Sequence, residues 1–157
     1  MTWDELFFNL IKEYKLKSKD PSSQFACLII NPDKSIVASG FNGFPRGVND
    51  DAERYANREL KYKLVSHAEA NGICQAAKHG IALDGCSIYV ESYPCSTCCK
   101  LIIQSGIKEI VLNGDSEIHN DTGPASFRVR WAEEIKMTEM MCQEAQVSIR
   151  VYHKDAK

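Results

Sequence analysis

Two short motifs in this chain hold residues that could bind a metal ion and move a proton. A His-Ala-Glu run occupies positions 67–69, and a Pro-Cys-Ser-Thr-Cys run occupies positions 94–98. The spacing predicts that each run begins a helix, where Cys95 and Cys98 can direct both sulfurs at one point and free N–H groups stabilise thiolates. Together with His67 they form a predicted set of zinc ligands.

Three protein ligands leave one position of a tetrahedral zinc site open, which is typical of catalytic sites because structural sites fill all four positions. Zinc lowers the pKa of a bound water from about 16 toward about 7, so a nearby base can ionise it at neutral pH. Glu69 lies two residues after His67, where its carboxylate can turn into a pocket without binding the metal. The sequence predicts one catalytic zinc ion per chain, with Glu69 as the proton shuttle.

A closed structural zinc site is the alternative interpretation, and it requires a fourth ligand. Cys74, His79 and Cys99 are the candidates. On an ideal helix Cys99 points about 100° away from Cys98, and Cys74 lies about two turns below His67. We therefore prefer the open site and expect the cysteines outside the motif to be core thiols.

The elements that must position these motifs follow from the spacing of apolar residues. Residues 2–17 have a helical period and begin with a capping box. Apolar runs at 25–30 and 35–39, joined by a proline-containing turn, predict a β-hairpin. Residues 50–65 are polar and are expected to be partly helical.

The second half of the chain alternates strands with helices. The predicted helices are 67–79, 96–104 and about 125–144, and the predicted strands are 86–91, 109–112 and 147–152. Gly80 and Gly106 are expected to end the first two helices. Strands joined by helices indicate parallel neighbours. We expect a single domain, 1–157, of the α/β class, a three-layer α/β/α fold with a mixed sheet of about five strands.

Composition excludes several classes of function. The 157 residues are 44% hydrophobic and 25% charged, with a formal net charge of -2. No run of about 18 apolar residues is present to span a bilayer, and the N-terminus lacks the layout of a secretory signal. No Lys/Arg-rich run is present to bind a nucleic-acid polymer. We expect a cytoplasmic protein, in a host cytoplasm for a viral chain, whose partner is a small anionic molecule and neither a polymer nor a membrane.

The chain resembles the cytidine/deoxycytidylate deaminase superfamily, and in particular the deoxycytidylate (dCMP) deaminases, from about Phe25 to Ile110. A His-x-Glu run followed by Pro-Cys-x-x-Cys is the signature of zinc deaminases. The resemblance rests on three runs: Gly40-Phe-Asn-Gly-Phe-Pro-Arg-Gly47, Ser66-His-Ala-Glu-Ala-Asn71 and Ser92-Tyr-Pro-Cys-Ser-Thr-Cys-Cys-Lys-Leu-Ile-Ile-Gln-Ser-Gly-Ile-Lys-Glu-Ile-Val111. It implies a cytidine-deaminase-like fold and zinc-dependent hydrolysis of dCMP to dUMP and ammonia, which supplies thymidylate synthesis.

The resemblance also implies roles for individual residues. Zinc-activated water attacks C4 of cytosine, while Glu69 protonates N3 and then carries a proton to the leaving ammonia. Asn42 bonds the sugar hydroxyl, the Ala68 N–H bonds the pyrimidine O2, and the Tyr93 carbonyl accepts from the amino group. Asn42 has a structural interpretation as well, because Asn before Gly favours a turn.

The 5'-phosphate has a less obvious binding partner. Arg46, in the glycine-rich loop, is the candidate because arginine binds phosphate in a bidentate manner; a solvated loop arginine is the competing interpretation. Lys78 lies about 16 Å along the helix from His67, so it could reach only the site of a neighbouring subunit.

By the same resemblance, the glycine-rich loop is similar to part of an effector site at which dCTP activates and dTTP inhibits many members. Phe41, Asn42 and Gly43 are the expected effector contacts, with Mg2+ accompanying a triphosphate. A homo-oligomer is expected, because members are commonly hexamers. Gly72, Cys74 and Cys99 depart from the residues usual at their positions, which is expected to affect packing or effector response rather than the reaction.

Three other functions remain open from the sequence. The substrate could be another cytosine compound, such as dCTP, deoxycytidine or a 5-modified dCMP. A polynucleotide base deaminase uses the same zinc chemistry but needs a basic groove. A non-catalytic nucleotide sensor stabilised by zinc has no use for the proton shuttle that Glu69 provides.

Overall fold

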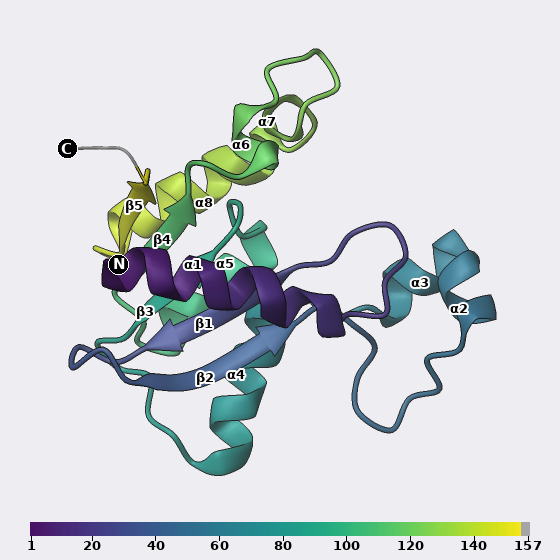
Figure 1. Cartoon of the computed structure of the whole chain (residues 1–157), viewed down its shortest axis with the longest axis horizontal. Coiled ribbons are helices and arrows are strands. Elements are labelled where there is room, and N and C mark those ends of the chain that lie inside the picture. The colour runs from purple at the N-terminus through teal and green to yellow at the C-terminus, as the bar shows by residue number, and fades with distance from the viewer. Residues whose placement is uncertain (155–157) are drawn as a thin grey trace.

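In the computed structural model, which describes residues 1–154 except for the side chain of His119, the centre of the molecule is a five-stranded sheet with the strand order β2-β1-β3-β4-β5 (Figure 1). The strands are β1 (Ala26–Ile30), β2 (Ile36–Phe41), β3 (Ser87–Val90), β4 (Glu109–Asn113) and β5 (Ser148–Tyr152). β1 is antiparallel to β2 and β3, whereas β3, β4 and β5 are parallel. The predicted α/β fold with a mixed sheet is confirmed.

Helices cover both faces of this sheet because every central strand is apolar on both sides. Helix α1 (Trp3–Tyr14) lies over one face, in front of the sheet in Figure 1, where Phe7 and Ile11 pack against Leu28 and Tyr89. Helices α4 (Ala68–His79), α5 (Ser96–Gln104) and α8 (Ala132–Glu144) cover the opposite face, around a second core cluster that includes Ile29. Both core clusters support the strands that lead to the cysteine motif.

Local sequence signals set the ends of several helices as expected. The Thr2 side chain accepts a hydrogen bond from the Glu5 N–H, 3.2 Å, and so caps α1, which continues as the 3-10 turn η1 (Lys15–Lys17). Gly80 ends α4 with a φ of 66°, and Gly106 follows α5 with a φ of 86°. The polar stretch contains α2 (Ala52–Ala56) and α3 (Arg58–Leu64), as predicted.

The predicted continuous helix over about 125–144 is wrong. Two helices, α7 (Phe127–Arg130) and α8, form in its place, and the short helix α6 (Glu117–Asn120) precedes them; α6 and α7 extend beyond the sheet in Figure 1. The Ser126 side chain accepts from the Val129 N–H, 3.4 Å, and starts α7. Trp131, with φ -111° and ψ 17°, lies outside helical geometry and separates α7 from α8. The apolar period continues across this break, so the period alone did not reveal it.

An ion-pair cluster fixes α1 to the sheet. The Asp4 carboxylate accepts from Arg150 of β5, with Oδ2 to Nη1 at 2.8 Å, and from the Tyr89 hydroxyl of β3 at 2.6 Å. The hydrogen bond from Arg150 is the main cause that holds the pKa of Asp4 below its ordinary value of 3.8.

Among the described residues, no helix has the length and apolar character needed to cross a bilayer.

We expect Asp4→Asn to lower the melting temperature by a few degrees at pH 7, corresponding to about 1 kcal/mol for a partly exposed, charge-assisted contact. Because the folded-state pKa of Asp4 is depressed, its contribution is present above pH 3.8 and is lost as the pH falls through the folded value. The difference between variant and wild type should therefore shrink in melting curves recorded below pH 3.8. Glu59→Gln, in the exposed pair with Lys63, is the control. An undiminished difference at low pH would contradict the assignment.

Candidate metal centre and substrate pocket

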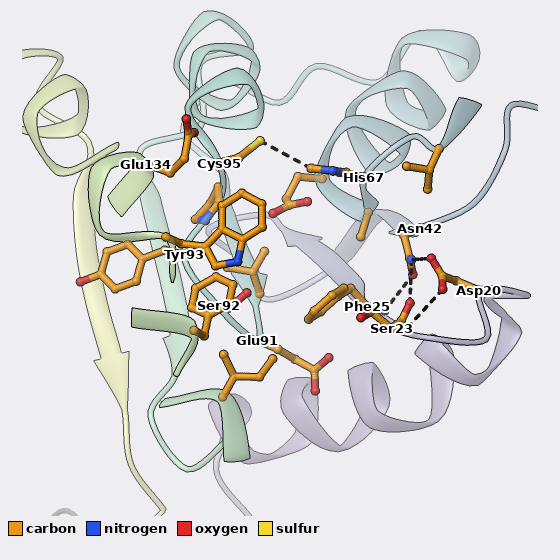
Figure 2. Close-up of a pocket in the computed structure, with 18 of the residues that line it drawn as sticks. Asp20, Ser23, Phe25, Asn42, His67, Glu91, Ser92, Tyr93, Cys95 and Glu134 are labelled. Atoms are coloured by element: carbon orange, nitrogen blue, oxygen red, sulfur yellow. Dashed lines mark hydrogen bonds between the residues drawn. The ribbon is translucent and has the colours of Figure 1, made fainter. Parts of the chain in front are cut away.

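The N-termini of α4 and α5 lie next to each other. His67 is the N-cap residue of α4 and Cys95 is the N-cap residue of α5. His67 Nδ1 lies 3.5 Å from Cys95 Sγ and 3.6 Å from Cys98 Sγ, and the three donor atoms all lie within 4.8 Å of one another. Figure 2 shows the side chains of His67 and Cys95 pointing toward each other.

The spacing of these donors fits zinc. Zn–S bonds of about 2.3 Å and Zn–N bonds of about 2.0 Å at tetrahedral angles place sulfur and nitrogen about 3.5 Å apart, as observed. Among the side chains that the structure describes, which do not include that of His119, the group of donors close enough to share an ion contains His67, Cys95 and Cys98. Cys74 and His79 are exposed on α4, and Cys99 is buried against Cys142, with their sulfurs 3.6 Å apart. The set therefore leaves a coordination position open.

Local electrostatics favour thiolate at the start of α5. The Cys98 N–H donates to Cys95 Sγ at 3.5 Å, and both helix N-termini direct their positive dipole ends at the cluster. Hydrogen bonds from Cys98 and, secondarily, from His67 lower the pKa of the Cys95 thiol to about 4. A thiolate at Cys95 is the form that binds a cation at neutral pH.

Glu69 lines the same cavity from the first turn of α4, outside the group that the three donors form. Removal of its carboxylate from solvent raises the pKa of Glu69 above its ordinary value. A raised pKa brings a carboxyl group closer to the working pH of a general acid and base, which must both accept and donate a proton.

The cavity in front of these residues has a volume of about 620 Å³ and is open to solvent, within the range of small-molecule sites. Of the residues predicted to contact a substrate, Asn42, Ala68 and Tyr93 line it. The Tyr93 side chain points away from the centre, and its hydroxyl donates to Glu139 at 3.0 Å (Figure 2). The predicted contact of the Tyr93 carbonyl with the amino group stays a prediction.

The Asn42 amide already has protein partners. Its Oδ1 accepts from the Phe25 N–H and its Nδ2 donates to the Ser23 carbonyl, both at 2.8 Å (Figure 2). The side chain is buried, with 5% exposed. In this structure Asn42 therefore holds the 23–25 segment as one wall of the pocket.

The structure does not bring the other predicted contacts into the cavity. Arg46 is exposed on the glycine-rich loop and is not among the lining residues. Phe41 packs on Tyr14, and Gly43 exchanges backbone hydrogen bonds with Ser66 at 2.8 and 3.1 Å. Lys78 is exposed in the last turn of α4, at the opposite end from His67.

Two parts of the cavity wall were missed by the sequence analysis. The region from α6 to the start of α8 contributes Phe127, Arg130 and Trp131, and a buried ion pair joins Lys61 to Asp20 at 2.8 Å. Two aromatic residues and two arginines within 127–131 were the available signal, but the predicted helix assigned their spacing to core packing.

Helix α8 fixes the loop that carries the cysteines. Glu134 accepts from the Ser96 N–H at 2.6 Å, and the buried Thr138 hydroxyl donates to the Pro94 carbonyl at 2.9 Å. The two backbone groups that α8 binds, the Pro94 carbonyl and the Ser96 N–H, lie on either side of Cys95. The position of the Cys95 sulfur therefore depends on a helix almost 40 residues further along the chain.

Helix α4 approaches β2 so closely that there is no room for a side chain at Gly40. A Cβ on Gly40 would overlap the Ala68 carbonyl oxygen and the Gly72 nitrogen, and a Cβ on Gly72 would lie 2.9 Å from Cys27 Sγ. The departure at Gly72 thus has a packing reason. This contact sets the position of the start of α4, where His67 and Glu69 lie.

We expect Gly40→Ala to destabilise the fold by about 2 kcal/mol or more, because the added methyl group meets backbone atoms that cannot move independently. Zinc retention should fall with it. Gly43→Ala is the matched control, since its Cβ would meet only the Tyr55 hydroxyl at 3.7 Å. Melting curves and zinc-to-protein ratios of the two variants test this; equal effects at both positions would count against the close-contact explanation.

Comparisons with known proteins agree with this geometry. The family model described as the cytidine and deoxycytidylate deaminase zinc-binding region matches residues 1–113. A human deoxycytidylate deaminase is 40% identical over 131 residues, covering 80% of this chain and 72% of the relative. An uncharacterized deaminase from the luxG 3' region of Aliivibrio fischeri is 36% identical over 147 residues, covering 94% of this chain and 91% of the relative.

A solved structure shows the same fold. The dCMP deaminase from the cyanophage S-TIM5, crystallised in complex with dCMP and dUMP, superposes with a TM-score of 0.70 and covers 94% of this chain and 95% of the phage chain. Sequence identity is 21%, so this similarity concerns the arrangement of helices and strands.

Proposed function

Since the chain belongs to the cytidine and deoxycytidylate deaminase family, we propose that its single domain, 1–157, is an enzyme that hydrolyses dCMP to dUMP and ammonia. The observation that carries this proposal is the meeting of His67, Cys95 and Cys98 in front of Glu69, at the end of a cavity large enough for a nucleotide. The human relative is named deoxycytidylate deaminase, and the phage structure was solved with dCMP and dUMP.

In the proposed reaction the three donors hold zinc and Glu69 moves protons. Zinc, when bound there, polarises a water molecule so that it can act as a nucleophile at neutral pH. Glu69 accepts a proton from that water and donates it to N3 as C4 is attacked. It then carries the second proton to the 4-amino group, which leaves as ammonia. One carboxylate serves both steps because its raised pKa lets it hold a proton between them.

The pyrimidine is oriented by backbone groups at the two helix starts. The Ala68 N–H belongs to the first turn of α4, where N–H groups have no intrahelical acceptor, and it donates to the pyrimidine O2. The Tyr93 carbonyl, two residues before Cys95, accepts from the 4-amino group. Asn42 helps to bind the sugar in one of two ways. It holds the pocket wall at residues 23–25, or it exchanges one of its two hydrogen bonds to that wall for a hydrogen bond to the sugar hydroxyl.

Assembly and regulation form a further part of the proposal, supported only by the family. It comprises a homo-oligomer, hexameric as is common in the family, activation by dCTP with Mg2+ and inhibition by dTTP at the loop that contains Phe41 and Gly43. Light scattering coupled to size-exclusion chromatography, with and without each nucleotide, tests it. A monomer unaffected by either nucleotide would contradict it.

The substrate is tested by following the loss of cytosine absorbance with zinc-loaded protein. We expect the highest kcat/KM for dCMP among dCMP, CMP, dCTP and deoxycytidine. Preference for another of these compounds would correct the substrate while leaving the reaction class intact. Absence of turnover on all four would overturn the proposed reaction.

Glu69→Gln should keep one zinc ion per chain and lose about 10²- to 10⁴-fold in kcat, since general acid–base catalysis contributes a factor of this size. Metal analysis and single-turnover kinetics measure the two effects separately. Glu59→Gln, an exposed carboxylate on α3, should change neither. Loss of zinc from Glu69→Gln would identify Glu69 as a ligand instead.

A further inference from the structure

The wall of the cavity contributed by α7 carries a guanidinium group with no assigned role. Resting on the proposed function, we infer that Arg130 binds the 5'-phosphate of the nucleotide and so sets the preference for a nucleotide over a nucleoside. Arg130 lines the same cavity as His67, Glu69 and Cys95, but it comes from the opposite end of the chain.

The charges around the cavity single out this residue. Among the described lining residues, Lys61 and Arg130 are the lysine and arginine side chains. Lys61 is buried and already paired, with Nζ 2.8 Å from Asp20 Oδ1. The Asp20 carboxylate also accepts from the N–H groups of Ser22 and Ser23. Lys61 is therefore committed to holding the wall of the pocket.

Arg130, in contrast, is exposed, and its guanidinium makes no hydrogen bond or ion pair with the described side chains or backbone, the side chain of His119 not being among them. Its five N–H donors can meet phosphate oxygens in a bidentate manner without first breaking a protein contact. It is the one lining cation, among the described residues, that is free to bind an anion.

The carboxylates of the cavity limit where a phosphate can lie. Glu91, at the α1 side of the pocket (Figure 2), is paired with Lys15 at 2.8 Å, and its second oxygen is buried without a partner. Glu117 and Asp121 of the α6 region line the cavity as well. A dianionic phosphate in such surroundings needs a permanent positive charge beside it, and Arg130 supplies that charge.

Two aromatic rings flank Arg130 in the chain. Phe127 and Trp131 also line the cavity, and their rings stack with centroids 6.0 Å apart. The segment thus presents apolar ring surface next to a guanidinium, a combination suited to the sugar and phosphate of a nucleotide. Trp131 lies outside helical geometry, between α7 and α8.

The test measures binding of dUMP and deoxyuridine to zinc-loaded protein by calorimetry, because these products differ only in the phosphate and do not react. Arg130→Gln should weaken dUMP binding about 10- to 100-fold, the loss of charge-assisted hydrogen bonds to phosphate. Deoxyuridine binding should change less than about twofold. Arg128→Gln on the same helix and Arg46→Gln on the glycine-rich loop, both exposed and outside the lining, should leave both affinities unchanged.

Several outcomes would overturn the inference: wild type without a preference for dUMP, an Arg130→Gln variant that keeps this preference, or one that weakens both ligands equally. Loss of the preference in Arg46→Gln would move the phosphate to the glycine-rich loop. The proposed reaction is judged separately, by turnover. A protein that binds dUMP through Arg130 but deaminates no cytosine nucleotide would retain the phosphate site and lose the proposed reaction.

Discussion

The active arrangement depends on the close approach of α4 to β2. Gly40 and Gly72 face each other there, and a Cβ on Gly40 would overlap the Ala68 carbonyl oxygen. The Cys27 thiol donates to the same oxygen at 3.2 Å, so the first turn of α4 is held from below by the sheet. His67 and Glu69 lie on either side of Ala68, and their positions relative to the cysteines follow from this backbone contact.

The two cysteines of the site are also positioned by residues that do not themselves belong to the group of metal donors. Cys95 and Cys98 lie at the start of α5, but the loop before them is held by Glu134 and Thr138 of α8. Helix α8 is in turn joined to α5 by the buried contact between Cys99 and Cys142. The metal centre is thus a junction of three helices on one face of the sheet, where two positive helix ends stabilise thiolate charge.

Several charged side chains of the cavity hold its walls. Asp20 and Lys61 bind each other, Glu91 binds Lys15, and Glu134 accepts from the Ser96 N–H at the start of α5. Carboxylates outnumber cationic side chains in the lining, and Lys61 is already paired. Under the inference above, recognition of the phosphate depends on one exposed arginine on the short helix α7.

The sequence by itself determined the chemistry and the class of fold. Ligand identity depends on residue types at fixed local spacing, so the motifs at 67–69 and 94–98 could be recognised without tertiary contacts, and the periodicity of the strands and helices predicted the mixed sheet that is observed. The tertiary structure decided the walls of the pocket. They come from segments about 100 residues apart, and Arg130 lines the cavity whereas Arg46 stays outside it. Side chains meet there because elements pack in three dimensions, and that packing leaves no pattern along the chain.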